Sequence, residues 1–201
     1  MQESCNIESL FDSLSDHAVA TAFLKRIRHN LENGYSVLDV GAGTGLLGSL
    51  IAPFVSNIII LDPDSRSLML AEKRCISQRL NNIRLIHGDI YNIGDKKADI
   101  LLFFMSLHHI EDITGVIAKC KSLCKSSTQI IIGDFYSENT PFHIYDHVPH
   151  NGLSPKKLSQ LLRDYGFRIT ECRPFHLLEK QNKDKIIYYP LFLLIGIFDR
   201  E

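Results

Sequence analysis

The 201-residue sequence predicts one α/β domain with a doubly wound, Rossmann-like sheet. Short apolar segments alternate with helical patterns through most of the chain, and a glycine-rich turn follows the first apolar segment. Such alternation favours parallel strands joined by right-handed crossovers, with helices on both faces of the sheet. The last two apolar segments have no helix between them, so they should pair antiparallel. We therefore expect seven mostly parallel strands with an antiparallel last strand, in a single domain over residues 1–201.

The expected strands are short and rich in β-branched residues. Asn57–Leu61 reads NIIIL, which is typical of a parallel strand buried on both faces. The other expected strands are Val37–Val40, Ile83–His87, Asp99–Phe104, Gln129–Gly133, Phe167–Cys172 and Pro190–Phe198.

The helices are predicted from apolar spacing and from capping residues. Residues 1–34 form an N-terminal segment of one or two helices, with Ser15 as a possible N-cap and Gly34 as a stop. Further helices are expected over Leu46–Ala52, from Asp64 toward Asn81, over Ile113–Leu123 and from Pro155 to Tyr165. Residues 135–153 interrupt the alternation as a long loop, a kind of segment that is often functional.

Composition excludes several classes of protein. The formal charge is −1, with 45% hydrophobic and 22% charged residues, so neither disorder nor a nucleic-acid partner is indicated. Five scattered cysteines predict reduced thiols in a cytoplasmic protein. The N-terminus has no apolar signal core, and the longest apolar stretch is too short for a membrane helix, so no membrane partner is expected.

The stretch SVLDVGAGTGLL, residues 36–47, reads as a strand, a tight turn and a helix start. Gly41, Gly43 and Gly45 would let a nucleotide-sized ligand approach the backbone. The run also contains Gly43-x-Gly45-x-x-Gly48, a dinucleotide fingerprint, and Asp62 lies near the place expected for a ribose-binding acid. An NAD(P)-dependent oxidoreductase is therefore one alternative.

Asp39 favours a different ligand. A carboxylate beside this turn would repel a pyrophosphate, by about 1 kcal/mol in water and roughly 4 kcal/mol at an effective dielectric of 20 for charges 4 Å apart. The same carboxylate attracts a cation. S-adenosylmethionine carries a sulfonium and an ammonium, so it fits the charge of this turn better than a dinucleotide does.

VLDVGAGTG closely resembles the first motif of the class I S-adenosylmethionine-dependent methyltransferases, and the resemblance extends over roughly Leu10 to Phe198. It implies that Asp39 and the three turn glycines line the methionine and ribose portion of the cofactor. It also implies that Asp62, followed by Pro63, accepts hydrogen bonds from both ribose hydroxyls. The alternative for Asp62 is a helix N-cap.

Two later motifs are similar to those of the same family. In IHGDI, Asp89 would accept from the adenine amino group and the N–H of Ile90 would meet the ring, whereas the alternative is a plain turn acid. ADILLFFMSLHHIED is similar to the fourth-strand motif of the small-molecule enzymes, so Phe104, Met105 and Ser106 would border the sulfonium and the substrate. The Gly88-Asp89 pair after the third strand, together with Asp39, disfavours the oxidoreductase.

The chain departs from some branches of this family. It has no Asn-Pro-Pro-Tyr box, which argues against methylation of nucleic-acid bases, and no lysine-rich metal pattern. The usual Lys-Pro-Gly-Gly turn before the fifth strand is replaced by residues 125–128, KSST. A metal site built from His143, Asp146, His147 and His150 lacks a fixed ligand spacing, and no metal is expected.

The sequence thus predicts methyl transfer from S-adenosylmethionine to a small-molecule acceptor by in-line displacement. The candidate bases are His108, His143 and His147, with His150 as a further one and His109 expected to be a packing residue. The acceptor pocket is expected under the loop of residues 135–153, between Phe104 and His108 on one side and the loop's aromatic and imidazole side chains on the other. A catalytically silent protein that binds the cofactor or a partner chain is the alternative.

Overall fold

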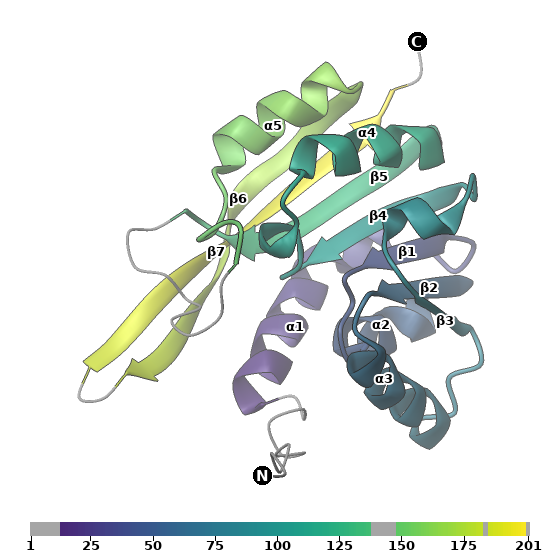
Figure 1. Ribbon diagram of the computed structural model, residues 1–201, viewed down its shortest axis with the longest axis horizontal. Coiled ribbons are helices and arrows are strands. Elements are labelled where there is room, and N and C mark those ends of the chain that lie inside the picture. Colours follow the sequence, from purple (N-terminus) through teal and green to yellow (C-terminus); the bar gives the residue numbers. More distant parts are fainter. Residues whose placement is uncertain (1–12, 138–147, 183–184, 200–201) are drawn as a thin grey trace, which may run out of the picture.

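The computed structural model describes residues 13–137, 148–182 and 185–199. Seven strands form one sheet in the order β3-β2-β1-β4-β5-β7-β6 (Figure 1). The strands are β1 Ser36–Val40, β2 Asn57–Asp62, β3 Ile83–His87, β4 Ala98–Phe104, β5 Cys124–Phe135, β6 Phe167–Asn182 and β7 Lys185–Phe198. The first five are parallel, and β7 runs antiparallel to both β5 and β6. The predicted doubly wound sheet is confirmed.

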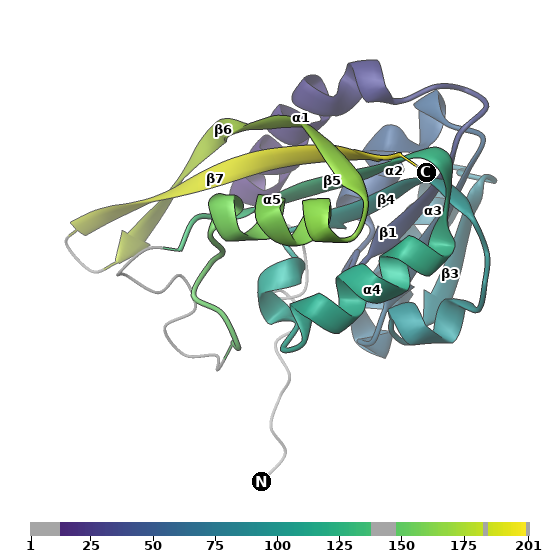
Figure 2. The ribbon, with the colours of Figure 1, turned by 90° about the horizontal axis from the view of Figure 1, so that it is seen from above.

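Helices cover both faces of the sheet, and each face has its own apolar core (Figure 2). The α-helices are α1 Leu14–Ile27, α2 Leu46–Ile51, α3 Ser65–Ser77, α4 Ile113–Leu123 and α5 Pro155–Asp164. Buried residues of α1, α2 and α3 form one core, and those of α4 and α5 form the other. None of the helices in the described ranges is long and apolar enough to cross a lipid bilayer.

The strand residues divide between these cores with a period of two. In β1, Val37 belongs to the core under α1 and α2, whereas Leu38 and Val40 belong to the core under α4. Because successive side chains of a strand point to opposite faces, a strand covered on both sides must be apolar at nearly every position. This requirement explains the continuous apolar runs in the sequence.

Two predicted helix starts differ from the structure. Ser13, not Ser15, caps α1, because Ser13 forms a capping box with Asp16. The Asp16 carboxylate accepts from the Ser13 N–H at 2.8 Å, and the Ser13 hydroxyl accepts from the Asp16 N–H at 3.2 Å. Helix α3 begins at Ser65 with Asp64 as its N-cap, so Asp62 is not the cap.

The chain between Ile27 and β1 was also predicted imperfectly. Helix α1 ends at Ile27, well before the predicted stop at Gly34, and a single 3₁₀ turn, η2 Arg28–Asn30, follows it. The described part of the N-terminal segment therefore contains one α-helix.

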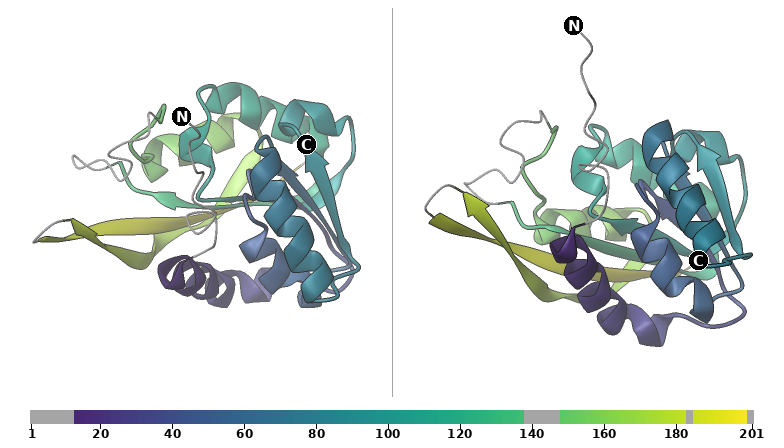
Figure 3. Two further views of the ribbon diagram at one scale, coloured as in Figure 1. Left: turned by 60° about the horizontal axis from the view of Figure 1, so that its bottom comes forward. Right: turned by 90° about the horizontal axis from the view of Figure 1, so that it is seen from below.

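The closing strands are much longer than predicted. β6 and β7 pair from Phe167↔Phe198 to Asn182↔Lys185, so the charged stretch expected to be a connection is the far end of a hairpin. Figures 1 and 3 show this hairpin extending beyond the rest of the sheet. Polar residues are tolerated there because one face of the pair is open: Leu177 is 51% exposed while its neighbour Leu178 is 8% exposed.

β5 is also longer than predicted, since the residues that replace the usual glycine turn belong to it. Ser127 has a φ of 68°, and the register with β4 shifts between Ala98 and Ile100. The Thr128 hydroxyl donates to the Ala98 carbonyl at 2.7 Å and accepts from the Lys125 N–H at 3.0 Å. The KSST segment is therefore an irregularity within a strand and not a separate turn.

The aromatic side chain of Phe23 packs helix α1 against the sheet. Phe23 is fully buried, with its ring centroid 4.7 Å from that of Phe104 and 5.2 Å from that of Phe175. A Cβ placed on Gly133 of β5 would lie 2.3 Å from the Phe23 ring. The missing side chain of Gly133 thus provides the space in which Phe23 packs.

Replacing Gly133 by alanine tests this packing. Because the ring cannot move without disturbing Phe104 and Phe175, we expect Gly133→Ala to lower the free energy of unfolding by about 1–3 kcal/mol. Gly34→Ala is the control, because a Cβ at Gly34 meets nothing within 4 Å. Urea unfolding should show the loss in the first variant only, and equal stabilities would contradict the proposed packing.

Candidate functional site

The glycine turn lies at the carboxyl ends of the central strands, where the strand order reverses. β1 pairs with β2 on one side and with β4 on the other, and ligands of open α/β sheets bind at such a point. Gly41, Gly43 and Gly45 all have positive φ, from 53° to 69°. A Cβ on Gly41 would lie 2.6 Å from Cβ of Ser106, so the turn presses directly against the end of β4.

Asp62 at the end of β2 holds this turn in place. Its carboxylate accepts from the Gly43 N–H at 2.7 Å through Oδ2 and from the Asp64 N–H at 2.8 Å through Oδ1. A carboxylate has about four acceptor positions. These two bonds therefore leave capacity for the hydroxyls of a ligand, and Asp62 lines the cleft beside it.

A cleft of about 600 Å³ opens beside Asp62. The predicted cofactor residues that line it are Gly41, Gly43, Asp62, Pro63, Asp89, Ile90 and Met105. Asp89 also caps the 3₁₀ turn η4, Ile90–Ile93, by accepting from the Tyr91 N–H at 2.9 Å. Asp89 therefore serves as a turn acid and as a cleft residue at once.

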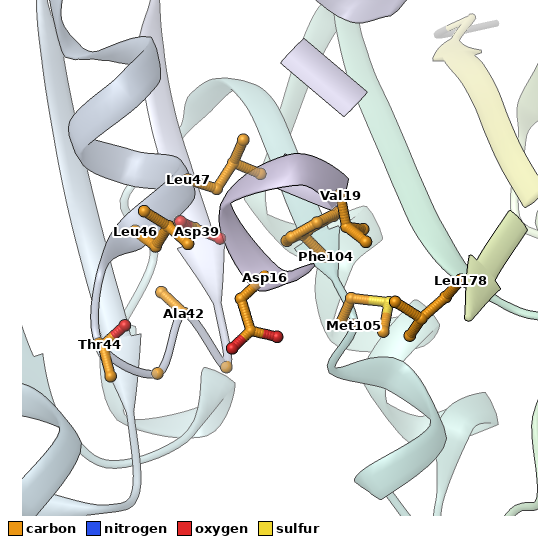
Figure 4. A pocket seen from close by; sticks show the side chains of 12 residues that line it. Asp16, Val19, Asp39, Ala42, Thr44, Leu46, Leu47, Phe104, Met105 and Leu178 are labelled. Carbon is orange, nitrogen blue, oxygen red and sulfur yellow. The ribbon is translucent and has the colours of Figure 1, made fainter. Parts of the chain in front are cut away.

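A second cavity of about 290 Å³ lies on the α1 side of the glycine turn (Figure 4). Asp39 and Phe104 line this cavity and not the larger cleft. Gly41, Gly43 and Met105 line both spaces, so a ligand long enough can cross the turn from one into the other. Met105 has a φ of 54°, unusual for a residue with a side chain, and its N–H donates to the Gly133 carbonyl at 2.8 Å.

Asp39 is a buried carboxyl that faces the smaller cavity. It is 2% exposed, and its side chain makes no hydrogen bond to the described residues. Burial, and then the charge of Asp62, raises the pKa of Asp39 to about 7. A cation in the cavity would stabilise the ionised carboxyl, whereas an anion would be repelled.

Gly45 was predicted to line the cofactor site, but it lies between packed elements. It lines neither cavity, and a Cβ on it would lie 3.0 Å from the Ile60 side chain and 3.1 Å from that of Ala71. Its role is close packing of the start of α2 against β2 and α3. The backbone approach to a ligand is left to Gly41 and Gly43.

The predicted base His108 is buried and supports the chain behind the site. It is 2% exposed and lines neither cavity. Its Nδ1 donates to Asp134 at 2.6 Å, and the fully buried Asp134 also accepts from the backbone N–H groups of His108 and Phe135 at 3.2 and 2.7 Å. His109, predicted to be a packing residue, is instead exposed and lines the larger cleft.

The predicted acceptor pocket under the long loop is only partly within the described chain. The ends of the loop are joined by a parallel bridge between Tyr136 and Leu153. His150 lies near them, with its Nε2 3.1 Å from the Ile110 carbonyl. His143 and His147, and Asp146 of the alternative metal site, lie outside the described residues. Among the described residues no three His, Cys, Asp or Glu side chains are grouped as metal ligands would be.

Sequence reasoning missed two residues of the smaller cavity, Asp16 of α1 and Leu178 of β6. Neither belongs to a ligand-binding motif, and each is far along the chain from the glycine turn. Ser13 followed by Asp16 could have been recognised as a capping box, but that pattern indicates a helix start and not a ligand.

Comparison with known proteins agrees with this geometry. A family described as a methyltransferase domain matches residues 37–127. The demethylmenaquinone methyltransferase of Tropheryma whipplei (strain Twist) is 32% identical over 104 residues, which are 51% of this chain and 42% of that protein. The chain therefore spans less than half the length of that relative.

Solved structures share the fold. The YcgJ protein of Bacillus subtilis superimposes with a TM-score of 0.75 at 14% identity, over 90% of this chain and 99% of that chain. The N-methyltransferase NodS of Bradyrhizobium japonicum, solved with S-adenosylhomocysteine, gives a TM-score of 0.72 at 15% identity, over 98% and 94%.

Residues 37–127 thus match a methyltransferase domain, and the fold is shared with solved structures that include the N-methyltransferase NodS. The matched residues 37–127 contain the glycine turn, Asp62 and Asp89, which are the parts that line the larger cleft. The smaller cavity also uses residues of α1 and β6, which lie outside the matched residues.

The raised pKa of Asp39 predicts that the stability of the protein without a bound ligand depends on pH. An unfolded aspartate titrates near pH 4, so between about pH 4 and pH 7 the folded protein keeps a proton that the unfolded chain has released. The contribution of Asp39 to stability therefore falls as the pH rises through this range.

Asp39→Asn should remove this dependence. We expect the variant to gain stability relative to the unaltered protein between about pH 4.5 and pH 8, by an amount of the order of a few kcal/mol. Urea unfolding at both pH values measures it. Asp95→Asn, at a position 93% exposed, is the control. A difference between Asp39→Asn and the unaltered protein that does not change with pH would be evidence against the raised pKa.

Proposed function

We propose that this protein is a class I methyltransferase, which transfers the methyl group of S-adenosylmethionine to a small-molecule acceptor by in-line displacement. The observation that carries the proposal is the buried carboxyl of Asp39, which makes no hydrogen bond to the described residues and lies beside a glycine turn that lines two cavities. A cationic ligand suits that carboxyl, and a pyrophosphate does not. A relative named for demethylmenaquinone supports a small acceptor.

The proposed cofactor would occupy both cavities. Asp89 and Ile90 would meet adenine in the larger cleft, and Asp62 would accept from the ribose hydroxyls. The methionine end would cross Gly41 and Gly43 into the smaller cavity. The methyl group would then lie close to Met105, which lines both spaces.

The main contribution of the protein would be positioning. A sulfonium methyl is already activated, so holding the nucleophile about 3–3.5 Å from it supplies most of the acceleration. Val19, Phe104 and Leu178 form an apolar wall of the smaller cavity, which suits an acceptor with an apolar body.

Calorimetric titration tests the cofactor. We expect the protein to bind S-adenosylmethionine and S-adenosylhomocysteine, and to bind NAD weakly or not at all. Asp62→Ala should weaken S-adenosylmethionine binding tenfold or more, because hydrogen bonds to a charged acceptor are worth roughly 1.5–3 kcal/mol each. Tight binding of NAD without binding of S-adenosylmethionine would contradict the proposal.

A catalytically silent protein that binds the cofactor is the second candidate, because the predicted base His108 lines neither cavity and His143 and His147 lie outside the described residues. Release of S-adenosylhomocysteine on incubation with a pool of small metabolites would exclude it. Cofactor binding with no turnover on any pool would favour it.

We also propose that His108 acts as a positioning residue. With Asp134 it holds the 3₁₀ turn η5, Leu107–His109, against the end of β5, immediately after Met105 and Ser106 of the site. Removing one partner of a buried hydrogen-bonded carboxyl costs about 3–5 kcal/mol if the carboxyl remains charged.

His108→Ala should therefore lower the free energy of unfolding by about 3 kcal/mol and weaken cofactor binding. His108→Asn is the matched variant, since its side-chain amide can still donate to Asp134, and it should restore most of both losses. Thermal unfolding and S-adenosylmethionine titration measure the two effects. If His108→Asn bound the cofactor normally but lost turnover by 10²-fold or more, His108 would be the base that the sequence suggested.

A further inference from the structure

The charged side chains that line the smaller cavity are both acidic. Within the described part of the chain these are Asp16 and Asp39, and the other lining residues are apolar side chains, glycines and Thr44. The two carboxyls come from elements far apart in the sequence, the first turn of α1 and the end of β1. The cavity therefore presents a negative field to whatever enters it.

Asp16 points into this cavity from α1 (Figure 4). Its orientation is set by the helix cap, because Oδ2 accepts from both the N–H and the hydroxyl of Ser13, each at 2.8 Å. The cap uses one oxygen of the carboxylate. The charge of Asp16 and its other oxygen, which makes no hydrogen bond to the described residues, remain available to a ligand.

Asp39 gives the second, independent observation that a ligand belongs here. It is 98% buried, faces the cavity and has no hydrogen-bond partner among the described residues. A buried polar group without a partner is unfavourable, so a cationic donor is the group that would complete this site.

We propose that Asp16 is a cofactor-binding residue, whose carboxylate together with that of Asp39 holds the α-ammonium at the methionine end of S-adenosylmethionine. This inference rests on the proposed function. An ammonium has three donors and can serve two carboxylates at once, whereas the methionine carboxylate would be repelled by both. Helix α1 would then be part of the cofactor site as well as a cover of the sheet.

The test compares three ligands in calorimetric titrations of two variants. S-adenosylmethionine and S-adenosylhomocysteine both carry the ammonium, and 5′-methylthioadenosine lacks the amino-acid end. Asp16→Asn removes the charge but keeps an oxygen that can accept from Ser13. Ser13→Ala weakens the helix cap but keeps the charge.

We expect Asp16→Asn to weaken binding of both ammonium-bearing ligands by about three- to fivefold, the range for an exposed ion pair. Binding of 5′-methylthioadenosine should stay within about twofold, and Ser13→Ala should leave all three affinities within about twofold. The effect of Asp16→Asn should also shrink as salt is added, because Asp16 is exposed.

Three results would overturn the inference. Unchanged affinity of Asp16→Asn for both ammonium-bearing ligands would exclude contact with the ammonium. An equal loss for 5′-methylthioadenosine, or an equal loss in Ser13→Ala, would show that Asp16 acts only through the helix. Failure of the unaltered protein to bind S-adenosylmethionine would instead overturn the proposed function, and this inference with it.

Discussion

The site depends on the carboxylate of Asp62, which joins the end of β2 to the glycine turn after β1. The chain passes from strand to helix within five residues. The turn makes a hydrogen bond within itself from the Gly45 N–H to the Ala42 carbonyl at 3.0 Å, but the N–H groups of Gly41, Ala42 and Gly43 need acceptors from outside it. Asp62 supplies the missing acceptor for Gly43 N–H, and the Leu61 carbonyl accepts from the N–H groups of Gly41 and Ala42. The turn is therefore fixed by its neighbouring strand before any ligand arrives.

A second constraint is the absence of side chains where elements meet. Gly41 allows the turn to lie against Ser106, and Gly133 allows Phe23 to lie against β5. Gly41 lines both cavities, and Ser106 lines the larger one. The contact of Phe23 with β5 fixes α1 across the sheet, which brings Asp16 to the smaller cavity. The shape of the ligand site therefore depends on close packing that these two glycines allow.

The acidic residues around the site differ in how many hydrogen bonds the protein donates to their carboxylates. Asp62 is bonded to the turn and Asp89 caps a 3₁₀ turn, so the protein itself satisfies part of each carboxylate. Asp39 is buried without a hydrogen bond to the described residues, and burial, followed by the charge of Asp62, raises its pKa to about 7. The carboxyl with the least hydrogen bonding therefore lies on the side that would face the cationic end of the cofactor, where a cation would favour its ionised form.

The sequence by itself determined the parallel strands, the switch point and most of the larger cleft. Asp39, Asp62 and Asp89 each lie within or directly after a strand, so local pattern fixes which edge of the sheet they reach. It did not determine the smaller cavity, because Asp16 and Leu178 reach it only through the packing of α1 and of a hairpin at opposite ends of the chain. Nor could it show that His108 is buried against Asp134, or that Gly45 packs against Ala71 and not a ligand. Those outcomes depend on which side chains meet across the sheet, and tertiary packing alone decides that.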